Sequence, residues 1–453
     1  MVLENDLGRD DIKKLVFRLA IPSMLAQFIN VLYGVIDRIY VGNIAEIGDL
    51  ALAGIGICAP ITALVLAFAS WIGVGGAPLL SIYLGEDKKD EARRVLASSF
   101  MMLCVISCVL TILLLLFKKP LLLGFGASEV IYPLADEYFS VYILGTIFAL
   151  LALGMNQFIL SQGFAKVAMK SVLIGAILNI VLDPIFIFTL DMKIQGAALA
   201  TVISQVVSCA YTLRFLFGKQ TLIPITFGGY SCSIMKKILK IGVIPFIIVA
   251  LDSVMLIALN MVFKSYGGEK MGDLLITATA ILQSFMLMIT MPLSGITMGT
   301  QAILGYNYGA RNSKRVLSAQ KYIFILSLIF ILIMLLIAQT IPHLFVRIFT
   351  DNVETIQLTS WAIKIYTLAL IGVAIQYVVV DGFTGMGVIN VAILLSMGRK
   401  SFFFIFVCLI PLVSDVTHVY YAAPLSDTIG ATITSICYCL LIKRILRKRE
   451  LAV

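Results

Sequence analysis

Four aspartates lie inside long apolar stretches of this 453-residue sequence, namely Asp37, Asp183, Asp252 and Asp381. An aspartate at the centre of a membrane-spanning helix costs about 2.5–3.5 kcal/mol on insertion scales, so each one requires a function or a partner. Asn179 stands four residues before Asp183, which puts both side chains on one face of a helix. Asp37, Asn179 and Asp183 are therefore the first candidate site.

This first candidate site is rich in oxygen atoms. Pro184 directly follows Asp183 and has no N–H group, so the carbonyl of Ile180 loses its usual helical partner. Oxygen ligands suit a proton or a hard cation. We predict that Asp37, Asn179 and Asp183 bind the coupling ion, Na⁺ or H⁺. The alternative is a set of interhelical hydrogen bonds that only hold helices together.

The second half of the chain offers another polar group, made of Asp252, Asp381 and Gln283. Asp252 follows Pro245 by seven residues, which is two helical turns along one face. These side chains are predicted to bind a second cation or a cationic substrate. The alternative is a packing role or the wall of a water-lined cavity. Asp415 and Asp427 lie nearer the ends of the last apolar runs and are interpreted as interface or structural residues.

Three prolines within apolar stretches are candidate hinges: Pro22, Pro184 and Pro245. A proline inside a helix removes one backbone hydrogen bond and kinks the helix. We expect that neutralising Asp37 changes the bend at Pro22 and, with it, the shape of a cavity.

The composition places these residues in a membrane protein. The chain is 60% hydrophobic and only 13% charged, with a mean hydropathy of +1.04. A soluble domain carries about 25% charged residues to cover its core, so these apolar residues must face lipid. The net charge of +9 is interpreted as basic cytoplasmic loops, and no nucleic-acid partner is expected.

Apolar runs of about 20 residues or more predict twelve membrane-spanning helices. They lie near 15–41, 51–83, 95–117, 134–162, 168–190, 195–217, 237–264, 273–305, 317–340, 357–387, 391–414 and 419–442. With the N-terminus inside, most of the 34 lysines and arginines fall on the cytoplasmic side, and Arg399 and Lys400 are counted there. This places both termini in the cytoplasm. No signal peptide is recognised, and the first run is expected to remain as a span of a bacterial inner-membrane protein.

The two halves of the sequence resemble each other. Gly75 and Gly299 stand in similar segments 224 residues apart, and Gly85 and Gly309 repeat that offset. An offset of six spans gives both halves the same orientation, which predicts two six-helix lobes related by a pseudo-two-fold axis along the membrane normal. The predicted domains are an N-terminal lobe, 1–217, a cytoplasmic linker, 218–236, and a C-terminal lobe, 237–453.

An enzyme is not expected. The sequence has no GxxxxGK[ST], HExxH or GxSxG motif and no evident Ser/His/Asp set. Its eight cysteines form no CxxC, and its two histidines are far apart, so a zinc or haem site has little support. No cofactor is expected besides the coupling ion.

Several segments resemble the multidrug and toxic compound extrusion (MATE) transporters. The most specific are LNIVLDPIFIF at 178–188 and GYNYGA at 305–310, together with LAIPSMLAQFINVLYGVIDRIYVGNI at 19–44. The resemblance implies two lobes around a central cavity and export of organic cations by Na⁺ or H⁺ antiport. It ties Asp37, Asn179, Asp183 and Pro22 to cation or proton binding.

The resemblance leaves the coupling ion open. Asp252 and Asp381 resemble, by position, the acids that another branch of the family uses, and Thr384 stands where glutamine is usual. The alternative function is a flippase for lipid-linked oligosaccharides or lipids, whose cavity would need more cationic residues. The sequence suggests no internal Lys or Arg comparable to the internal aspartates, which favours cationic cargo. A monomer in the bilayer is expected.

Overall fold

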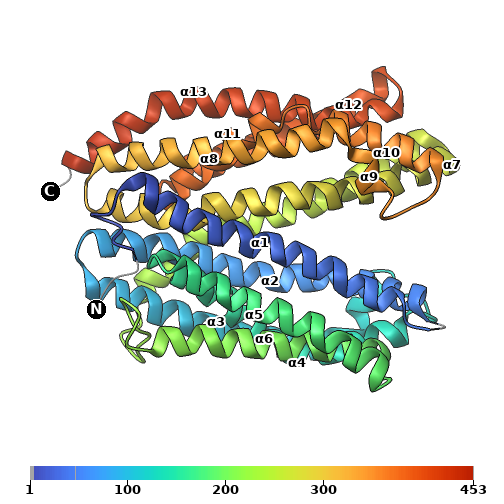
Figure 1. Ribbon diagram of the computed structural model, residues 1–453, viewed down its shortest axis with the longest axis horizontal. Coiled ribbons are helices and arrows are strands. Elements are labelled where there is room, and N and C mark those ends of the chain that lie inside the picture. The colour runs from blue at the N-terminus through green and yellow to red at the C-terminus, as the bar shows by residue number, and fades with distance from the viewer. Residues whose placement is uncertain (1–4, 46, 452–453) are drawn as a thin grey trace. The chain divides into compact units, whose positions relative to one another are not determined.

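A computed structural model describes residues 5–45 and 47–451; within these, the side chains at 49, 244–245, 249–250, 253–254, 257, 269 and 273 are outside the description. The described chain is mostly helical and contains no strand (Figure 1). The all-α membrane fold expected from composition is therefore confirmed.

The first half of the chain folds into long helices joined by short turns (Figure 1). They are α1 (Ile12–Gly42), α2 (Gly48–Gly85), α3 (Lys89–Gly124), α4 (Tyr132–Ser161), α5 (Ala165–Pro184), the π-helix η1 (Ile185–Thr189) and α6 (Lys193–Phe217). Within this half, α4 packs against α2, α3 and α6. The three neighbours bury Phe139 and Phe158 of α4 completely, because the apolar faces of four helices meet there.

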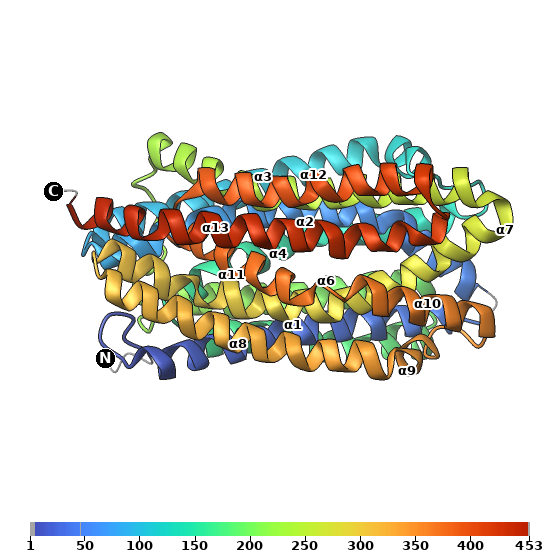
Figure 2. The same ribbon diagram turned by 90° about the horizontal axis from the view of Figure 1, so that it is seen from above.

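The second half follows the same plan with more interruptions. It contains α7 (Cys232–Gly309), α8 (Ser313–Thr340), α9 (Pro342–Val346), α10 (Val353–Tyr366), α11 (Leu370–Gly385), α12 (Ile389–Val413), the 3₁₀-helix η2 (Val416–Tyr421) and α13 (Ala422–Leu451). The helices α12 and α13 run side by side (Figure 2). The buried ring of Tyr420 fixes this end of the fold, since its hydroxyl contacts Thr279 and donates to the carbonyl of Leu275.

Ten of the described helices are long and apolar enough to cross a membrane, and the pair α10 and α11 adds one more. That pair is bent by 52° where a single span, 357–387, was expected. The predicted spans 237–264 and 273–305 both fall in α7, which is interrupted at Gly268. The φ of Gly268 is 66°, a left-handed conformation that favours glycine, so the chain turns there between two helices.

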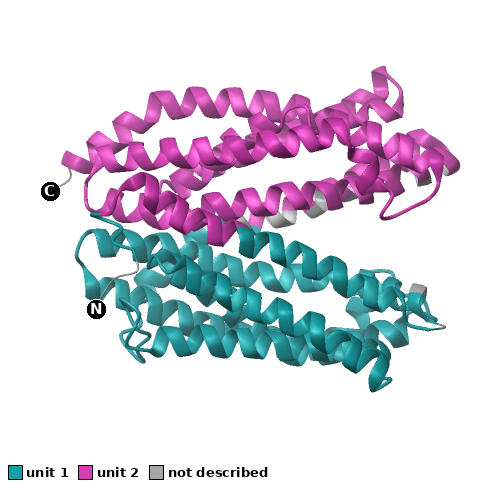
Figure 3. Ribbon diagram, viewed as in Figure 1, with its two compact units in different colours: residues 1–9, 25–246 teal, residues 10–24, 247–453 magenta. Residues whose placement is uncertain are grey.

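The described chain forms two compact units (Figure 3). Unit 1 comprises Met1–Arg9 and Leu25–Phe246, and unit 2 comprises Asp10–Met24 and Ile247–Val453. The division falls inside α1 and α7, shortly after Pro22 and Pro245, whereas the predicted lobes were divided at a linker. The first turns of α1 therefore pack within unit 2. There Gly295 allows a close approach, because an added Cβ would lie 2.6 Å from the carbonyl oxygen of Ser23.

The segment predicted as a linker is tied to unit 1 along part of its length. The side-chain oxygen of Gln162 accepts hydrogen bonds from the hydroxyl of Thr221 and the amide of Ile223, at 2.7 and 2.8 Å. Gln162 is only 1% exposed, so these bonds are shielded from water. This end of the segment is thus part of a packed unit.

Candidate functional site

The three residues predicted as the first site come together in unit 1. Asn179 and Asp183 lie on α5, are almost fully buried, and share a hydrogen bond of 3.2 Å from Nδ2 to Oδ1. The same amide nitrogen lies 3.4 Å from the hydroxyl of Thr201 on α6. The amide of Asn179 is therefore oriented by one residue of its own helix and one of the next.

Asp37 of α1 completes this cluster. Its carboxyl group lies close enough to that of Asp183 for the two to interact, and Arg38 interacts electrostatically with Asp37 as well. Two carboxylates in contact repel each other unless they share a proton or a cation lies between them. Binding of one proton or one monovalent cation would therefore stabilise the pair.

Oxygen atoms without hydrogen-bond partners are available to bind this proton or cation. Asp37 Oδ1, Asn179 Oδ1 and Asp183 Oδ2 are buried and have no hydrogen-bond partner within the described chain. A buried polar atom without a partner carries a desolvation penalty, and such exceptions in a native fold call for an explanation. Carboxylate and amide oxygens are ligands that a hard cation accepts, so this donor set fits Na⁺ as well as a proton.

Pro184 ends the regular part of α5 next to this cluster. The π-helix η1 begins at Ile185, immediately after the proline. A proline cannot donate the i→i−4 hydrogen bond, and π-turns inside helices are frequent at functional sites. Asp183 is thus placed at the last regular turn of a broken helix, as the sequence suggested.

Tyrosines surround the acidic pair, and the sequence reasoning did not identify them. Tyr33 interacts electrostatically with both Asp37 and Asp183. Tyr138 and Tyr142 of α4 stack with ring centroids 6.1 Å apart, and the hydroxyl of Tyr142 lies close to the side chain of Gln205. Their hydroxyl groups, like that of Thr201, are neutral proton donors near the carboxyl groups.

A spacing rule could have found these residues. Each of four helices presents two polar side chains one turn apart: Tyr33 and Asp37, Tyr138 and Tyr142, Asn179 and Asp183, Thr201 and Gln205. Residues four apart share one helix face. Polar i, i+4 pairs in otherwise apolar helices therefore mark the faces that meet at this cluster.

The residues of the predicted second site each have a different partner in unit 2. Asp381 of α11 accepts a hydrogen bond of 2.5 Å from the hydroxyl of Thr297. Gln283 lies close to the hydroxyl of Tyr366, and Asp252 pairs with the ammonium group of Lys400. The backbone at Pro245 is helical, and its side chain lies outside the described residues.

Unit 2 also contains two basic residues inside a span, and here the sequence interpretation was wrong. Arg399 and Lys400 lie within α12 (Ile389–Val413), ten or more residues and thus about 15 Å from its start. They were counted on the cytoplasmic side because lysine and arginine usually gather there, although the predicted span 391–414 contains both residues. In the structure Arg399 pairs with Asp427 at 2.8 Å. The expectation that no basic residue matches the internal aspartates is corrected accordingly.

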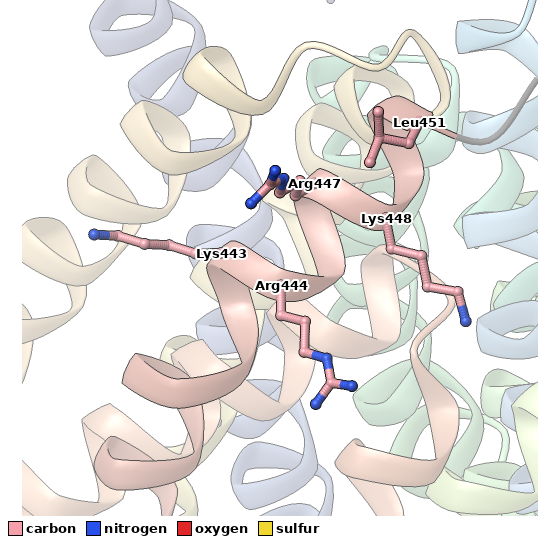
Figure 4. A pocket seen from close by; sticks show the side chains of 5 residues that line it. All are labelled: Lys443, Arg444, Arg447, Lys448 and Leu451. Atoms are coloured by element: carbon pink, nitrogen blue, oxygen red, sulfur yellow. The ribbon is translucent and has the colours of Figure 1, made fainter.

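Other charged groups lie at helix ends. Lys443, Arg444, Arg447 and Lys448 line an open hollow near the end of α13 together with Leu451 (Figure 4). Cations at a helix C-terminus interact favourably with the helix dipole. Asp415 caps η2, and hydrogen bonds from the hydroxyl and amide of Thr417 lower the pKa of its carboxyl group. Neither feature belongs to the acidic clusters.

Comparison with known proteins defines the class. The family model MatE matches two segments of the chain, residues 22–185 and 246–410, which also confirms the internal repeat. The multidrug export protein MepA of Staphylococcus haemolyticus is 24% identical over 375 residues, covering 82% of this chain and 80% of that protein.

Two solved structures are similar over nearly the whole chain. One is an outward-facing multidrug resistance MATE family transporter of the MOP superfamily, with a TM-score of 0.89 and 25% identity, covering 97% of this chain and 98% of that chain. The other is a MOP superfamily transporter from Pyrococcus furiosus described as having a binding pocket of reverse polarity, with a TM-score of 0.90, 25% identity and the same coverage.

These findings define a multi-pass helical membrane transporter rather than an enzyme. The chain belongs to the MatE family, whose members are the MATE transporters.

Proposed function

We propose that this protein exports small organic molecules, mainly cations, in exchange for Na⁺ or H⁺. The observation that carries the proposal is the pair of neighbouring carboxyl groups, Asp37 and Asp183, together with three buried oxygen atoms of Asp37, Asn179 and Asp183 that have no hydrogen-bond partner. The names of similar proteins, such as multidrug export protein, support small-molecule cargo.

In this mechanism Asp37, Asn179 and Asp183 hold the coupling ion. The ion neutralises the two carboxyl groups and removes their repulsion, so it stabilises the arrangement in which they touch. When the ion leaves, both carboxylates are charged and move apart. A ligand can shift a conformational equilibrium only through such a difference in interaction energy between the two states.

Pro22 is the proposed hinge that transmits this change. The helix α1 contributes its first turns to unit 2 and the remainder, with Asp37, to unit 1, and the division follows Pro22 by two residues. A proline weakens the helix at that point because one backbone hydrogen bond is missing. A movement at Asp37 can therefore bend α1 at Pro22 and act on both units. Pro184 and Pro245 are proposed as further hinges.

Asp252, Asp381 and Gln283 are proposed to contribute to a second cation or substrate site in unit 2. Both termini are proposed to lie in the cytoplasm of a bacterial cell, with the protein in the inner membrane as a monomer. The basic residues at the end of α13 support this orientation.

A flippase for lipid-linked oligosaccharides remains the second candidate, and the basic residues Arg399 and Lys400 favour it. Both are neutralised by aspartates, however, so they add no net positive charge to unit 2. Antiport of organic cations is therefore placed first.

The test is ethidium efflux from proteoliposomes under separate Na⁺ and pH gradients, with Asp37→Asn and Asp252→Asn measured alongside. Efflux driven by one gradient and lost in Asp37→Asn is expected, because one half of the acidic pair is removed. Loss in Asp252→Asn alone contradicts coupling in unit 1. No gradient-driven efflux by folded protein favours the flippase.

A further inference from the structure

The ion pair between Lys400 and Asp252 is unequal in its exposure. The Lys400 side chain on α12 is 12% exposed, whereas the Asp252 side chain on α7 is 56% exposed. A carboxylate this exposed in a membrane-spanning helix is tolerated only where the helix faces water or a polar partner. The pair thus joins a buried cation to a carboxylate that the protein covers only in part, and a carboxylate left uncovered at this depth is expected to face a water-filled cavity.

The neighbouring pair provides an internal reference. Arg399 and Asp427 are 21% and 8% exposed, so both partners are shielded. If either side chain left the pair, the other would remain charged, buried and without a partner. Breaking such a pair is strongly unfavourable. Lys400 also lies close enough to Asp427 to interact electrostatically with it. Among the four charged side chains, Asp252 can therefore leave its ion pair at the lowest cost in free energy.

This asymmetry decides which kind of group can exchange into the pair. A cation that took the place of Lys400 on Asp252 would leave the buried ammonium group without its direct partner. An anion that took the place of Asp252 on Lys400 would keep the ammonium group paired and release a carboxylate that is already hydrated. Exchange of the anion is therefore the favourable reaction.

We propose that Lys400 binds an anionic group of the transported molecule, such as a carboxylate, which displaces the carboxylate of Asp252. The inference rests on the proposed export function and specifies its substrates. The preferred molecules carry a carboxylate as well as a cationic aromatic centre, and Asp252 acts as the tethered competitor that covers Lys400 when no substrate is present.

Two matched dyes test this proposal. Rhodamine 6G is an ethyl ester and a cation, and rhodamine 19 is the corresponding free acid, with the same cationic ring system and a carboxylate. Binding of each dye to the purified full-length protein is measured by fluorescence polarisation, and gradient-driven efflux of each is measured in proteoliposomes.

The proposal predicts that Lys400→Met weakens binding of rhodamine 19 at least about tenfold, the change expected for loss of a charge-assisted contact. Rhodamine 6G binding changes less than about twofold in the same variant. Lys400→Arg retains rhodamine 19 binding, and Asp252→Asn strengthens it because the competitor is neutralised. Lys400→Met leaves only the hydrated Asp252 without a partner, so folding is expected. The double variant Asp252→Asn/Lys400→Met leaves no unpaired charge and must show the same loss.

Three outcomes overturn the proposal. The first is an equal loss of binding of both dyes in the Lys400→Met and double variants. The second is a loss of rhodamine 19 binding in Asp252→Asn. The third is a wild-type protein that binds rhodamine 6G but not rhodamine 19. Failure of the export function looks different, because binding then keeps the predicted pattern while no gradient drives efflux of either dye. If the wild type binds neither dye, the substrate class and this proposal fail together.

Discussion

The acidic clusters of unit 1 and unit 2 differ in how the negative charge of their carboxylates is compensated. In unit 1, Asp37 and Asp183 interact with each other among neutral amides and hydroxyls, and Arg38 interacts electrostatically with Asp37. In unit 2, Asp427 and Asp252 are each neutralised by a basic residue of α12. A carboxylate at membrane depth thus signals ion binding when the chain leaves its charge uncompensated, and a fixed or exchangeable ion pair when it does not.

The largest expected effect is in unit 1. Asp183→Asn should abolish gradient-driven ethidium efflux in proteoliposomes, because the remaining carboxyl group no longer needs a shared ion. Asp415→Asn is the matched control, since this aspartate is exposed and caps η2, and its efflux should equal that of the wild type. Full efflux by folded Asp183→Asn protein would remove unit 1 from the coupling mechanism.

The next effect separates the two ion pairs of unit 2. Arg399→Met should destabilise the protein by about 3–5 kcal/mol, because it leaves Asp427 buried without its partner. Lys400→Met should change stability by only about 0–1 kcal/mol, since Asp252 is exposed. Thermal unfolding of both variants in detergent is the measurement.

A double variant checks the cause of that difference. Arg399→Met/Asp427→Leu removes both charges and should recover most of the lost stability, because a buried pair can often be replaced by apolar residues without loss. If Lys400→Met is as unstable as Arg399→Met, the two pairs are equivalent and the comparison within unit 2 is wrong.

A smaller effect is expected at Thr201, which helps to orient Asn179. Thr201→Val removes one hydrogen bond, usually about 0.5–1.5 kcal/mol, and should weaken binding of the coupling ion by up to about tenfold. The ion concentration for half-maximal efflux measures this change. Thr428→Val is a suitable control, because its hydroxyl bonds only to the carbonyl of Pro424 in the described chain.

The smallest expected effect concerns pH. Hydrogen bonds from Thr417 lower the pKa of Asp415 in the folded protein. The folded protein is therefore more stable when this carboxyl group is charged. The cap therefore contributes fully above the pKa of the unfolded chain and is lost as the pH falls through the lowered folded value. The protection of the Thr417 amide against hydrogen exchange, relative to its intrinsic rate at each pH, should fall only in that acidic range. The same rate at neutral pH in Asp415→Ala and wild type would show that the cap contributes nothing.

Much of the fold could be predicted from the sequence, because the apolar runs and the internal repeat are strong signals. The interruptions were harder to predict. The bend between α10 and α11 and the break at Gly268 occur within continuous apolar runs, which hydropathy alone reads as straight spans. The units also divide within α1 and α7, since packing of the first turns rather than chain order decides the boundary.

The sites show the same limit. Asn179 and Asp183 could be paired by spacing, but the interaction of Asp37 on α1 with Asp183 on α5 depends on the tertiary fold, which spacing within one helix does not report. The ion pairs of Arg399 and Lys400 were missed for a different reason. Two adjacent basic residues follow the statistics of a loop, and only the positions of Asp252 and Asp427 on other helices make them tolerable inside a span.

The most direct test of the account is substrate-induced ion release from the purified protein. Ethidium is added to protein in weakly buffered detergent solution, and released protons are followed with a pH-indicator dye and released Na⁺ with radioactive sodium. The account predicts release of one of these ions by the wild type and by Asp252→Asn, and none by Asp37→Asn or Asp183→Asn. Undiminished release by the two unit 1 variants, or its loss in Asp252→Asn alone, would contradict an ion site at Asp37, Asn179 and Asp183.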